Sequence, residues 1–223
     1  MNYQWDFSSV WMYRQIFMAA TLQTLWLTVL SVLTAVPLGL LLTFIKSSKW
    51  RALSIAASSF IQVVRAIPPL VFVVWIFYCL PILADVTLSA NQTVVFALAA
   101  YSAVFFSEIF RSGIQSVERG HLEAAYAFGM RKPLALVRIV APIAFRRVFP
   151  PFVSQCVLVL KNTSLASVVA VPELLYEGQR LSLQRFRPME TLTTVAAVFL
   201  ALILPMTAYA GWLERNWKRK FAD

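Results

Sequence analysis

The sequence predicts an all-α membrane protein in which about five helices cross the bilayer, and three observations support this fold class. Of the 223 residues, 60% are hydrophobic and only 13% are charged, which is about half the charged fraction of a typical soluble domain. Uncharged runs of the length that a bilayer requires recur along the chain. Basic residues gather in some of the connections between these runs and are sparse in others, as in multi-pass membrane proteins.

Each predicted span is placed by an uncharged run. Crossing about 30 Å of hydrocarbon takes about 20 helical residues at about 1.5 Å each. Four runs approach or exceed this length, and a fifth, 148–160, suffices only if its helix continues past Lys161. We therefore expect one transmembrane domain over residues 1–223 whose fourth span carries polar groups at membrane depth. The predicted spans are 16–45, 66–84, 86–110, 146–170 and 191–213.

The basic residues predict how the chain is oriented. Fourteen of the 20 Lys and Arg residues follow the first, third and last spans, five lie in the other connections or at the N-terminus, and Arg65 is unassigned. Because Lys and Arg accumulate in cytoplasmic loops, we expect the N-terminus outside and the C-terminus in the cytoplasm. A net charge of +10 could suggest nucleic-acid binding, but this placement of the basic residues argues against it.

The chain lacks the motifs of energy-coupling and catalytic sites. Its six glycines form neither G-x-x-x-x-G-K-[ST] nor G-x-G-x-x-G, so the sequence offers no phosphate cradle. His121 is the single histidine, and no catalytic triad or metal cluster can be built around it. We expect no catalytic residue, metal or cofactor in this chain. Any uphill transport would then draw its energy from a partner or from an ion gradient.

A short helix is predicted at about 121–129, within the long basic connection. Gly120 is the expected N-cap, and Glu123 at the third helical position would suit the positive end of the helix dipole. Gly129 provides a left-handed stop, with Pro133 just beyond. A helix of about 12 Å is too short to span a membrane. It is also too apolar to lie free in water, so it requires a partner surface or, alternatively, lipid headgroups.

The residues of this segment resemble a known motif. Glu123-Ala124-Ala125, then Gly129, then after nine residues Ile139-x-x-Pro142, is similar to the EAA motif of permease subunits of ATP-binding-cassette (ABC) importers. The family often has Leu where this chain has Ala141. Further segments resemble the polar amino-acid uptake branch: Arg65-Ala66-Ile67-Pro68, 107–117, 160–165 and 187–190. Together with Asp6-Phe7-Ser8-Ser9, they make glutamate/aspartate permeases the most similar members.

The resemblance implies the fold of a type I ABC importer transmembrane domain with a cytoplasmic coupling helix, in a bacterial inner membrane. It implies a transport subunit without enzymatic activity, whose partners are an ABC ATPase that binds ATP and Mg²⁺, a second identical or homologous permease, a periplasmic solute-binding protein and membrane lipid. The residues expected to contact the ATPase are Glu123, Ala124, Ala125, Gly129 and His121.

Polar residues within the predicted spans are the candidates for the substrate path, because charge is costly in hydrocarbon. They are Lys161, Asn162, Thr163, Ser164, Arg65 and Glu108. We expect the first four to interrupt the fourth helix, with packing or gating as the alternative role. An ion pair of Glu108 with Arg111, three residues on, and snorkelling of Arg65 to an interface are the structural alternatives for the other two.

The expected substrate is an acidic or other polar amino acid. The family often has Asp at the position of Asn162, and its absence disfavours a cationic substrate, as does Lys161 beside it. A basic amino acid or an opine-like solute is the alternative substrate. A channel or an ion-coupled carrier without an ATPase is the alternative mechanism.

Overall fold

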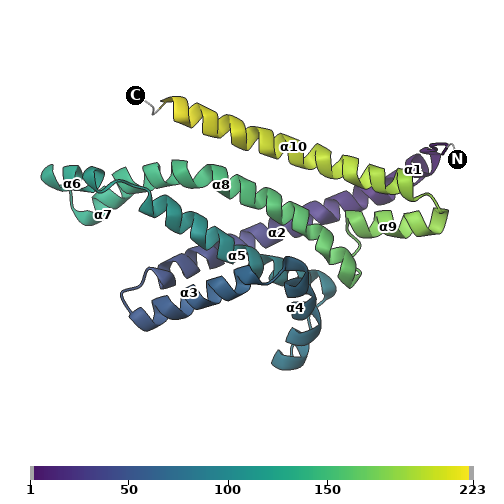
Figure 1. The fold of residues 1–223 in the computed structure, drawn as a ribbon, viewed down its shortest axis with the longest axis horizontal. Coiled ribbons are helices and arrows are strands. Elements are labelled where there is room, and N and C mark those ends of the chain that lie inside the picture. Colours follow the sequence, from purple (N-terminus) through teal and green to yellow (C-terminus); the bar gives the residue numbers. More distant parts are fainter. Residues whose placement is uncertain (1–2, 221–223) are drawn as a thin grey trace.

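The computed structural model describes the backbone of residues 3–220 and the side chains of residues 3–217, and this part of the chain is helical without strands (Figure 1). The helices are α1 (Ser8–Met12), α2 (Arg14–Lys46), α3 (Arg51–Ala66), α4 (Pro69–Ala84), α5 (Ala90–Gln115), α6 (Arg119–Ala127), α7 (Lys132–Ala135), a π-helix η1 (Leu136–Val140), α8 (Ala141–Asn162), a 3₁₀-helix η2 (Thr163–Val169), α9 (Leu174–Arg185) and α10 (Pro188–Lys220). The all-α fold class is confirmed.

Four stretches of the described residues are long and apolar enough to cross a membrane by themselves. They are Arg14–Lys46, Ala90–Gln115, Lys132–Val169 and Pro188–Trp217. The pair formed by α3 and α4 qualifies only when taken together, which raises the number to five. In Figure 1 the long helices follow the long axis of the molecule, with α6 and α7 at one end and α1, α9 and the N-terminus at the other.

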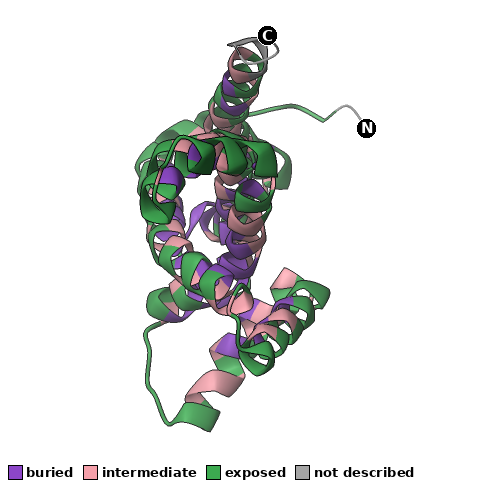
Figure 2. Cartoon of the chain, turned by 90° about the vertical axis from the view of Figure 1, so that its left-hand side faces the viewer, coloured by how far each residue is buried: buried purple, intermediate pink, exposed green. Residues whose placement is uncertain are grey.

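The centre of the bundle is the contact between α2 and α5. A stripe of small residues at four-residue spacing, Ser31, Ala35 and Gly39, is buried on α2. A Cβ atom on Gly39 would lie 2.8 Å from Cβ of Phe106 and 2.9 Å from the carbonyl oxygen of Ala103. Small residues allow such close backbone approach between membrane helices. Figure 2, viewed from the α6 end, shows buried residues turned inward and exposed ones on the outer surface.

The direction of these two helices decides the topology between them. Leu27 packs in one cluster with Val94, and farther along both helices the Thr43 hydroxyl donates to the carbonyl of Ser107 over 3.0 Å. The helices therefore run in the same direction. Because two parallel spans need a return crossing between them, α3 and α4 must carry the chain back across the membrane.

The predicted second span, 66–84, begins later than the corresponding helical segment of the structure. The helical segment starts as α3, ends at Ala66, and is followed by extended backbone at Ile67 and Pro68 and a bend of 106°. Pro68 and Pro69 lack the amide hydrogens that would continue the helix, and proline disfavours helical geometry in the residue before it. α3 is amphipathic, so it was not recognisable as an uncharged run.

The fourth span also differs from the expectation. It begins at Lys132 and includes η1, α8 and η2. The expected interruption at Lys161–Ser164 is present only as a change of helix type, because α8 ends at Asn162 and the span continues as the 3₁₀-helix η2 without a break. The Thr163 hydroxyl donates to the Leu160 carbonyl over 2.7 Å, which keeps the hydroxyl satisfied within the helix. The helical path ends at Ala170, which has a left-handed φ of 57°.

At the end of the bundle opposite α6, buried carboxylates form hydrogen bonds that stabilise the starts of α9 and α10. Glu190, at the start of α10, accepts hydrogen bonds from the Tyr3 hydroxyl at 2.5 Å and the Asp6 amide at 3.0 Å. Glu173 caps α9, accepting the amide hydrogens of Leu175 and Tyr176 at 3.0 and 2.7 Å. Burial raises the pKa of Glu173 to about 7, although these two hydrogen bonds oppose the shift.

Candidate functional site: the coupling helix and the polar path

α6 begins earlier than the sequence indicated. Glu118, in extended backbone, is its N-cap, so Gly120 is the second helical residue and Glu123 the fifth. The expectations that Gly120 caps the helix and that Glu123 occupies its third position are therefore wrong. Since the dipole acts within the first turn, Glu123 gains little from it. A glycine followed by a carboxylate three residues later has the spacing of a cap, but local spacing alone does not determine where helical hydrogen bonding starts.

The end of α6 confirms the left-handed stop at Gly129. Its φ is +75°, its amide donates to the Tyr126 carbonyl at 2.9 Å, and the next amide, of Met130, donates to the Ala125 carbonyl at 3.0 Å. This pair of hydrogen bonds is a Schellman motif with glycine at its left-handed position. A Cβ atom on Gly129 would meet nothing within 4 Å. Glycine is therefore required by the backbone conformation and not by crowding from neighbouring atoms.

α6 has two apolar faces. Its inner face packs on the bundle through Leu122, against Val117 and the start of α8, and through Ala125, of which only 2% is exposed. His121, Glu123 and Ala124 are exposed, as is Gly129 beyond the helix. Ala125 is thus the one residue of the predicted ATPase contact that faces inward.

The outer face also carries two large aromatic side chains that the predicted contact residues did not include. Tyr126 is 43% exposed and Phe128 is 87% exposed. Large apolar side chains in a helix too short to span a membrane were the signal that could have identified them. Exposed apolar surface of this kind marks an interaction site.

α6 is held between the ends of two spans. Its preceding segment follows α5, and its following segment leads into α8. The Arg147 side chain donates to the Ser116 carbonyl, which links α8 to the chain just before α6. A Cβ atom on Gly113 would lie 2.1 Å from Cγ2 of Val148, so α5 and α8 are in close contact here. A displacement of α6 would therefore be transmitted to both spans.

Two of the candidate path residues are exposed cations within the candidate spans. Arg65 lies about 21 Å from Arg51 along α3, and Lys161 lies about 21 Å from Arg147 along α8, at about 1.5 Å per residue. Both are exposed, and neither forms an ion pair among the described residues. The guanidinium of Arg65 lies 5.8 Å from the Phe105 ring centroid. Such charges require water or protein around them, not hydrocarbon.

The remaining path candidates are less accessible. Thr163 is buried, whereas Asn162 and Ser164 are half-buried. Glu108 forms the predicted ion pair with Arg111 at 2.7 Å, which is confirmed, and a second one with Lys46 at 2.6 Å. Both carboxylate oxygens are therefore engaged, and Glu108 joins α2 to α5. The Lys46 contact could not be read from spacing, since the two residues are 62 positions apart.

Comparison with known proteins agrees with this architecture. Residues 35–219 match the family model described as binding-protein-dependent transport system inner membrane component. The chain is 30% identical over 216 residues to the glutamine transport system permease protein GlnP of Escherichia coli K12, which covers 96% of this chain and 99% of the relative. It is 32% identical over 192 residues to the nopaline transport system permease protein NocM of Agrobacterium fabrum C58, covering 82% and 80%.

Solved structures show the same fold. A crystal structure of an amino acid ABC transporter with histidines aligns with a TM-score of 0.88 at 29% identity, covering 96% of this chain and all of that one. An inward-facing MetNI methionine ABC transporter aligns with a TM-score of 0.73 at 16% identity, covering 92% and 97%. The chain belongs to the family of binding-protein-dependent transport system inner membrane components, as a multi-pass ABC importer permease of the polar amino-acid type.

Proposed function

We propose that this chain, together with a second permease subunit, forms the translocation path of an ATP-driven amino-acid importer and receives the stroke of a separate ATPase through α6. The exposed outer face of α6, with Tyr126 and Phe128 beside the left-handed turn at Gly129, carries this proposal. ATP and Mg²⁺ are bound by the ATPase, since this sequence has no phosphate cradle. A periplasmic binding protein delivers the substrate.

The orientation follows from charge and topology together. α6 and α7 lie at one end of the bundle (Figure 1), and the connection around them holds six of the basic residues counted above as cytoplasmic: Arg119, Arg131, Lys132, Arg138, Arg146 and Arg147. This end is therefore assigned to the cytoplasm, with the C-terminus, and the N-terminus to the periplasm. Reporter fusions after Ser48 and at the C-terminus should report cytoplasm, and a fusion at Val86 should report periplasm. A cytoplasmic report at Val86 would contradict the return crossing by α3–α4 that the parallel directions of α2 and α5 require.

The proposal of a second permease subunit is supported by exposed surface that is unfavourable in contact with lipid. Exposed Arg65 and Lys161 at membrane depth require an aqueous path or a facing protein. α4 extends away from the other helices and buries only Val73 and Ile76. A helix that is apolar all round is usually buried, so we assign α4 to the contact with the second subunit. The surfaces around Arg65 on α3 and Lys161 on α8 are assigned to that contact or to an aqueous path.

The imported solute is proposed to be an acidic or other polar amino acid without net positive charge. Lys161 and Arg65 place positive charge along the path, and Asn162 supplies no carboxylate to offset it. The similar permease of Escherichia coli is named for glutamine. An opine-like solute is the second candidate, on the observation that a relative of similar identity is named for nopaline. Uptake of glutamine and glutamate should exceed that of arginine by about tenfold, which takes only about 1.4 kcal/mol.

Two equally exposed phenylalanines test the ATPase contact. Phe128 at the α6 end is 87% exposed and Phe186 at the opposite end is 88% exposed. Phe128→Ser should reduce both ATPase co-purification and substrate-stimulated ATP hydrolysis, whereas Phe186→Ser should leave the ATPase bound. Retention of the ATPase by Phe128→Ser, with normal uptake, would place the contact elsewhere.

A further inference from the structure

α3 carries a polar stripe within a candidate membrane crossing. Ser58, Gln62 and Arg65 follow one another at spacings of four and three residues, which places their side chains on one face of the helix. Gln62 and Arg65 are exposed, and Ser58 is half-buried. α3 crosses the membrane together with α4, and hydrocarbon is unfavourable for exposed polar and charged side chains. The polar stripe therefore requires something other than acyl chains in front of it.

The rest of α3 has two other faces, and one of them suits lipid. Ile61 and Val64 are buried in one cluster with Tyr101 of α5. Phe60 and Val63 are 50% and 59% exposed, and at about 100° per residue they lie roughly opposite the polar stripe. Exposed apolar side chains are the ones that favour contact with lipid. This apolar face accounts for the lipid contact of α3, so the polar stripe faces a different environment.

The side chains of the polar stripe have no hydrogen-bond partner among the described residues. Ser54, one turn earlier, donates to the Lys46 carbonyl at 2.7 Å, whereas Ser58, Gln62 and Arg65 donate to no group in the part of the chain that the structure describes. The guanidinium of Arg65 lies 5.8 Å from the centroid of an aromatic ring on α5. This contact positions the guanidinium without engaging its N–H groups, so its donors remain available for a ligand.

The candidate spans offer Arg65 no negative partner. Glu108, Glu190 and Glu214 are the carboxylates in the described part of these spans. The first two are bonded within the chain, and the third also has an interaction partner. Two copies of the polar stripe placed face to face would set Arg65 against Arg65, and like charges repel. A negative group for Arg65 must therefore come from a molecule other than this chain or an identical copy of it.

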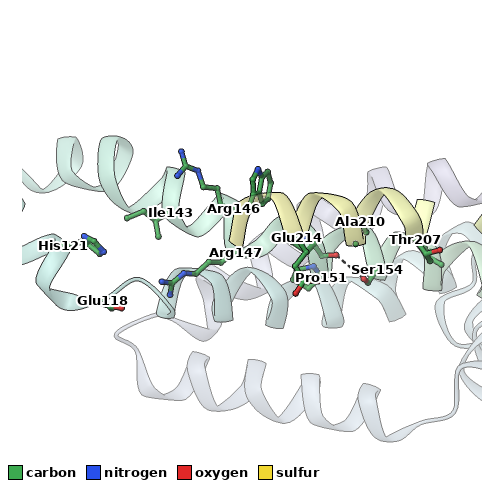
Figure 3. A pocket seen from close by; sticks show the side chains of 14 residues that line it. Glu118, His121, Ile143, Arg146, Arg147, Pro151, Ser154, Thr207, Ala210 and Glu214 are labelled. Atoms are coloured by element: carbon green, nitrogen blue, oxygen red, sulfur yellow. Dashed lines mark hydrogen bonds between the residues drawn. The ribbon is translucent and has the colours of Figure 1, made fainter. Parts of the chain in front are cut away.

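A groove of about 1450 Å³ between α8 and α10 (Figure 3) offers a carboxylate no comparable site. Arg147, toward its α6 end, already donates to the Ser116 carbonyl. Arg146 and Glu214, which also line the groove, have interaction partners as well. α3 lies on the side of the bundle away from α10 (Figure 1). The groove and the available guanidinium of Arg65 are therefore on different sides of the molecule.

We infer that the polar stripe of α3 lines the translocation path and binds the transported amino acid, with its α-carboxylate at Arg65 and its ammonium group at Gln62. The fork of an arginine matches a carboxylate, and charge-assisted hydrogen bonds are stronger than neutral ones. The amide oxygen of Gln62 can accept from an ammonium group. Ser58, one turn away, lines the path beside this pair.

This inference rests on the importer function proposed above and deepens it. Arg65 recognises a group that all amino acids share. The choice between acidic, neutral and cationic side chains is then made by other residues, so a change at Arg65 should weaken the binding of every amino acid by a similar factor.

Cysteine accessibility tests whether the polar stripe borders water. In the full chain with Cys79→Ala and Cys156→Ala, Ser58→Cys and Gln62→Cys should react with a membrane-impermeant, water-soluble thiol reagent in membrane vesicles. Val63→Cys, on the exposed apolar face of the same helix, is the matched control. It should stay unlabelled, because the reactive thiolate does not form in hydrocarbon.

Binding of the solute is measured as protection of Ser58→Cys, which leaves Arg65 and Gln62 intact. Glutamine should slow the labelling, whereas glutaminamide, in which an amide replaces the α-carboxylate, should not. Adding Arg65→Lys keeps the positive charge and loses the fork. It should leave labelling without solute unchanged and raise the glutamine concentration needed for protection about tenfold, equivalent to about 1.4 kcal/mol.

Two results would overturn the inference. Unlabelled cysteines at both Ser58 and Gln62 would mean that lipid or the second subunit covers the polar stripe. Labelling that glutamine and glutaminamide slow equally, or that neither slows, would mean that the stripe borders water without binding a carboxylate.

The outcome is separable from that of the α6 tests, because labelling and protection need neither the ATPase nor the binding protein. Loss of the ATPase contact at α6 with protection intact would refute the coupling assignment and leave the carboxylate site standing. Normal uptake and ATPase recovery with an unlabelled stripe would refute the site on α3 alone.

Discussion

α6 and α9 are short helices at opposite ends of the same bundle, and they are attached to it very differently. α9 buries five residues along its length: Leu174, Glu177, Gly178, Leu181 and Ser182. α6 buries only Ala125. Elements with few buried contacts open and move at low free-energy cost. The comparison indicates that the α9 end is a fixed scaffold, whereas the α6 end is a separate element that a partner can displace.

The two helices also end differently. Both end next to a residue with left-handed backbone, but after α6 that residue is Gly129 and after α9 it is Phe186. A left-handed conformation costs a residue with a side chain about 1–2 kcal/mol, and glycine almost nothing. Strain at Phe186 is tolerated because α9 is fixed by burial on both sides of Gly178. α6 has no comparable packing, so its turn depends on glycine.

The largest expected effect is on stability, and it comes from the tighter packing of α9 compared with α6. A Cβ atom on Gly178 would lie 2.3 Å from Cγ2 of Val195, whereas one on Gly120 in α6 would meet nothing within 4 Å. Gly178→Val should destabilise the protein by about 1–3 kcal/mol through overpacking. Gly120→Ala should be neutral or stabilising by up to about 1 kcal/mol. Thermal unfolding in detergent measures the stability of both variants. Equal unfolding midpoints would contradict the difference in packing between α6 and α9.

A pH effect is expected at the α9 end. Because burial raises the pKa of Glu173 to about 7 from its ordinary 4.5, the folded state binds this proton more tightly than the unfolded state. Its contribution to stability is therefore present below pH 4.5 and is lost as pH rises to about 7. Glu173→Gln, which keeps an oxygen to cap α9, should raise the melting temperature by a few degrees at pH 8 relative to wild type and change it little at pH 4.5. A pH-independent difference would contradict the assignment.

A smaller local change at α6 is expected to have a large functional consequence. Gly129→Val should cost about 1–2 kcal/mol locally, because its φ of +75° disfavours a Cβ. The spans should still insert, while uptake and substrate-stimulated ATP hydrolysis fall together, since α6 is misplaced. Phe186→Gly is the matched change at the other left-handed turn and should preserve both activities. Normal coupling in Gly129→Val would mean that α6 is not the contact.

The smallest structural effect is expected for Glu123→Lys. Glu123 is exposed and lies beyond the first turn of α6, so stability should change by less than about 0.5 kcal/mol. Co-purification of the ATPase should nevertheless decrease, because a reversed charge would face the partner. Unchanged ATPase recovery, in a variant whose melting temperature is also unchanged, would remove Glu123 from the contact surface.

The sequence by itself determined the features that depend on local order. Hydropathy over about 20 residues indicated the membrane class, and Gly129 indicated the left-handed turn. The orientation taken from the distribution of Lys and Arg stays a prediction. Pro68 and Pro69 likewise indicated a break, because proline restricts its own backbone and that of its neighbour. Each of these signals lies within one continuous segment of the chain, so it can be read without knowledge of how the segments pack.

Only the tertiary structure decided which surfaces meet. The ion pair of Lys46 with Glu108 joins residues that are distant in sequence. The prolines after α3 indicate a break in the helix but not its angle of 106°. The inward position of Ala125 on α6 and the groove between α8 and α10 also arise from helices brought together by the fold. Periodicity shows that a helix has faces, but the free energy of burying each face depends on partner surfaces that the local sequence does not contain.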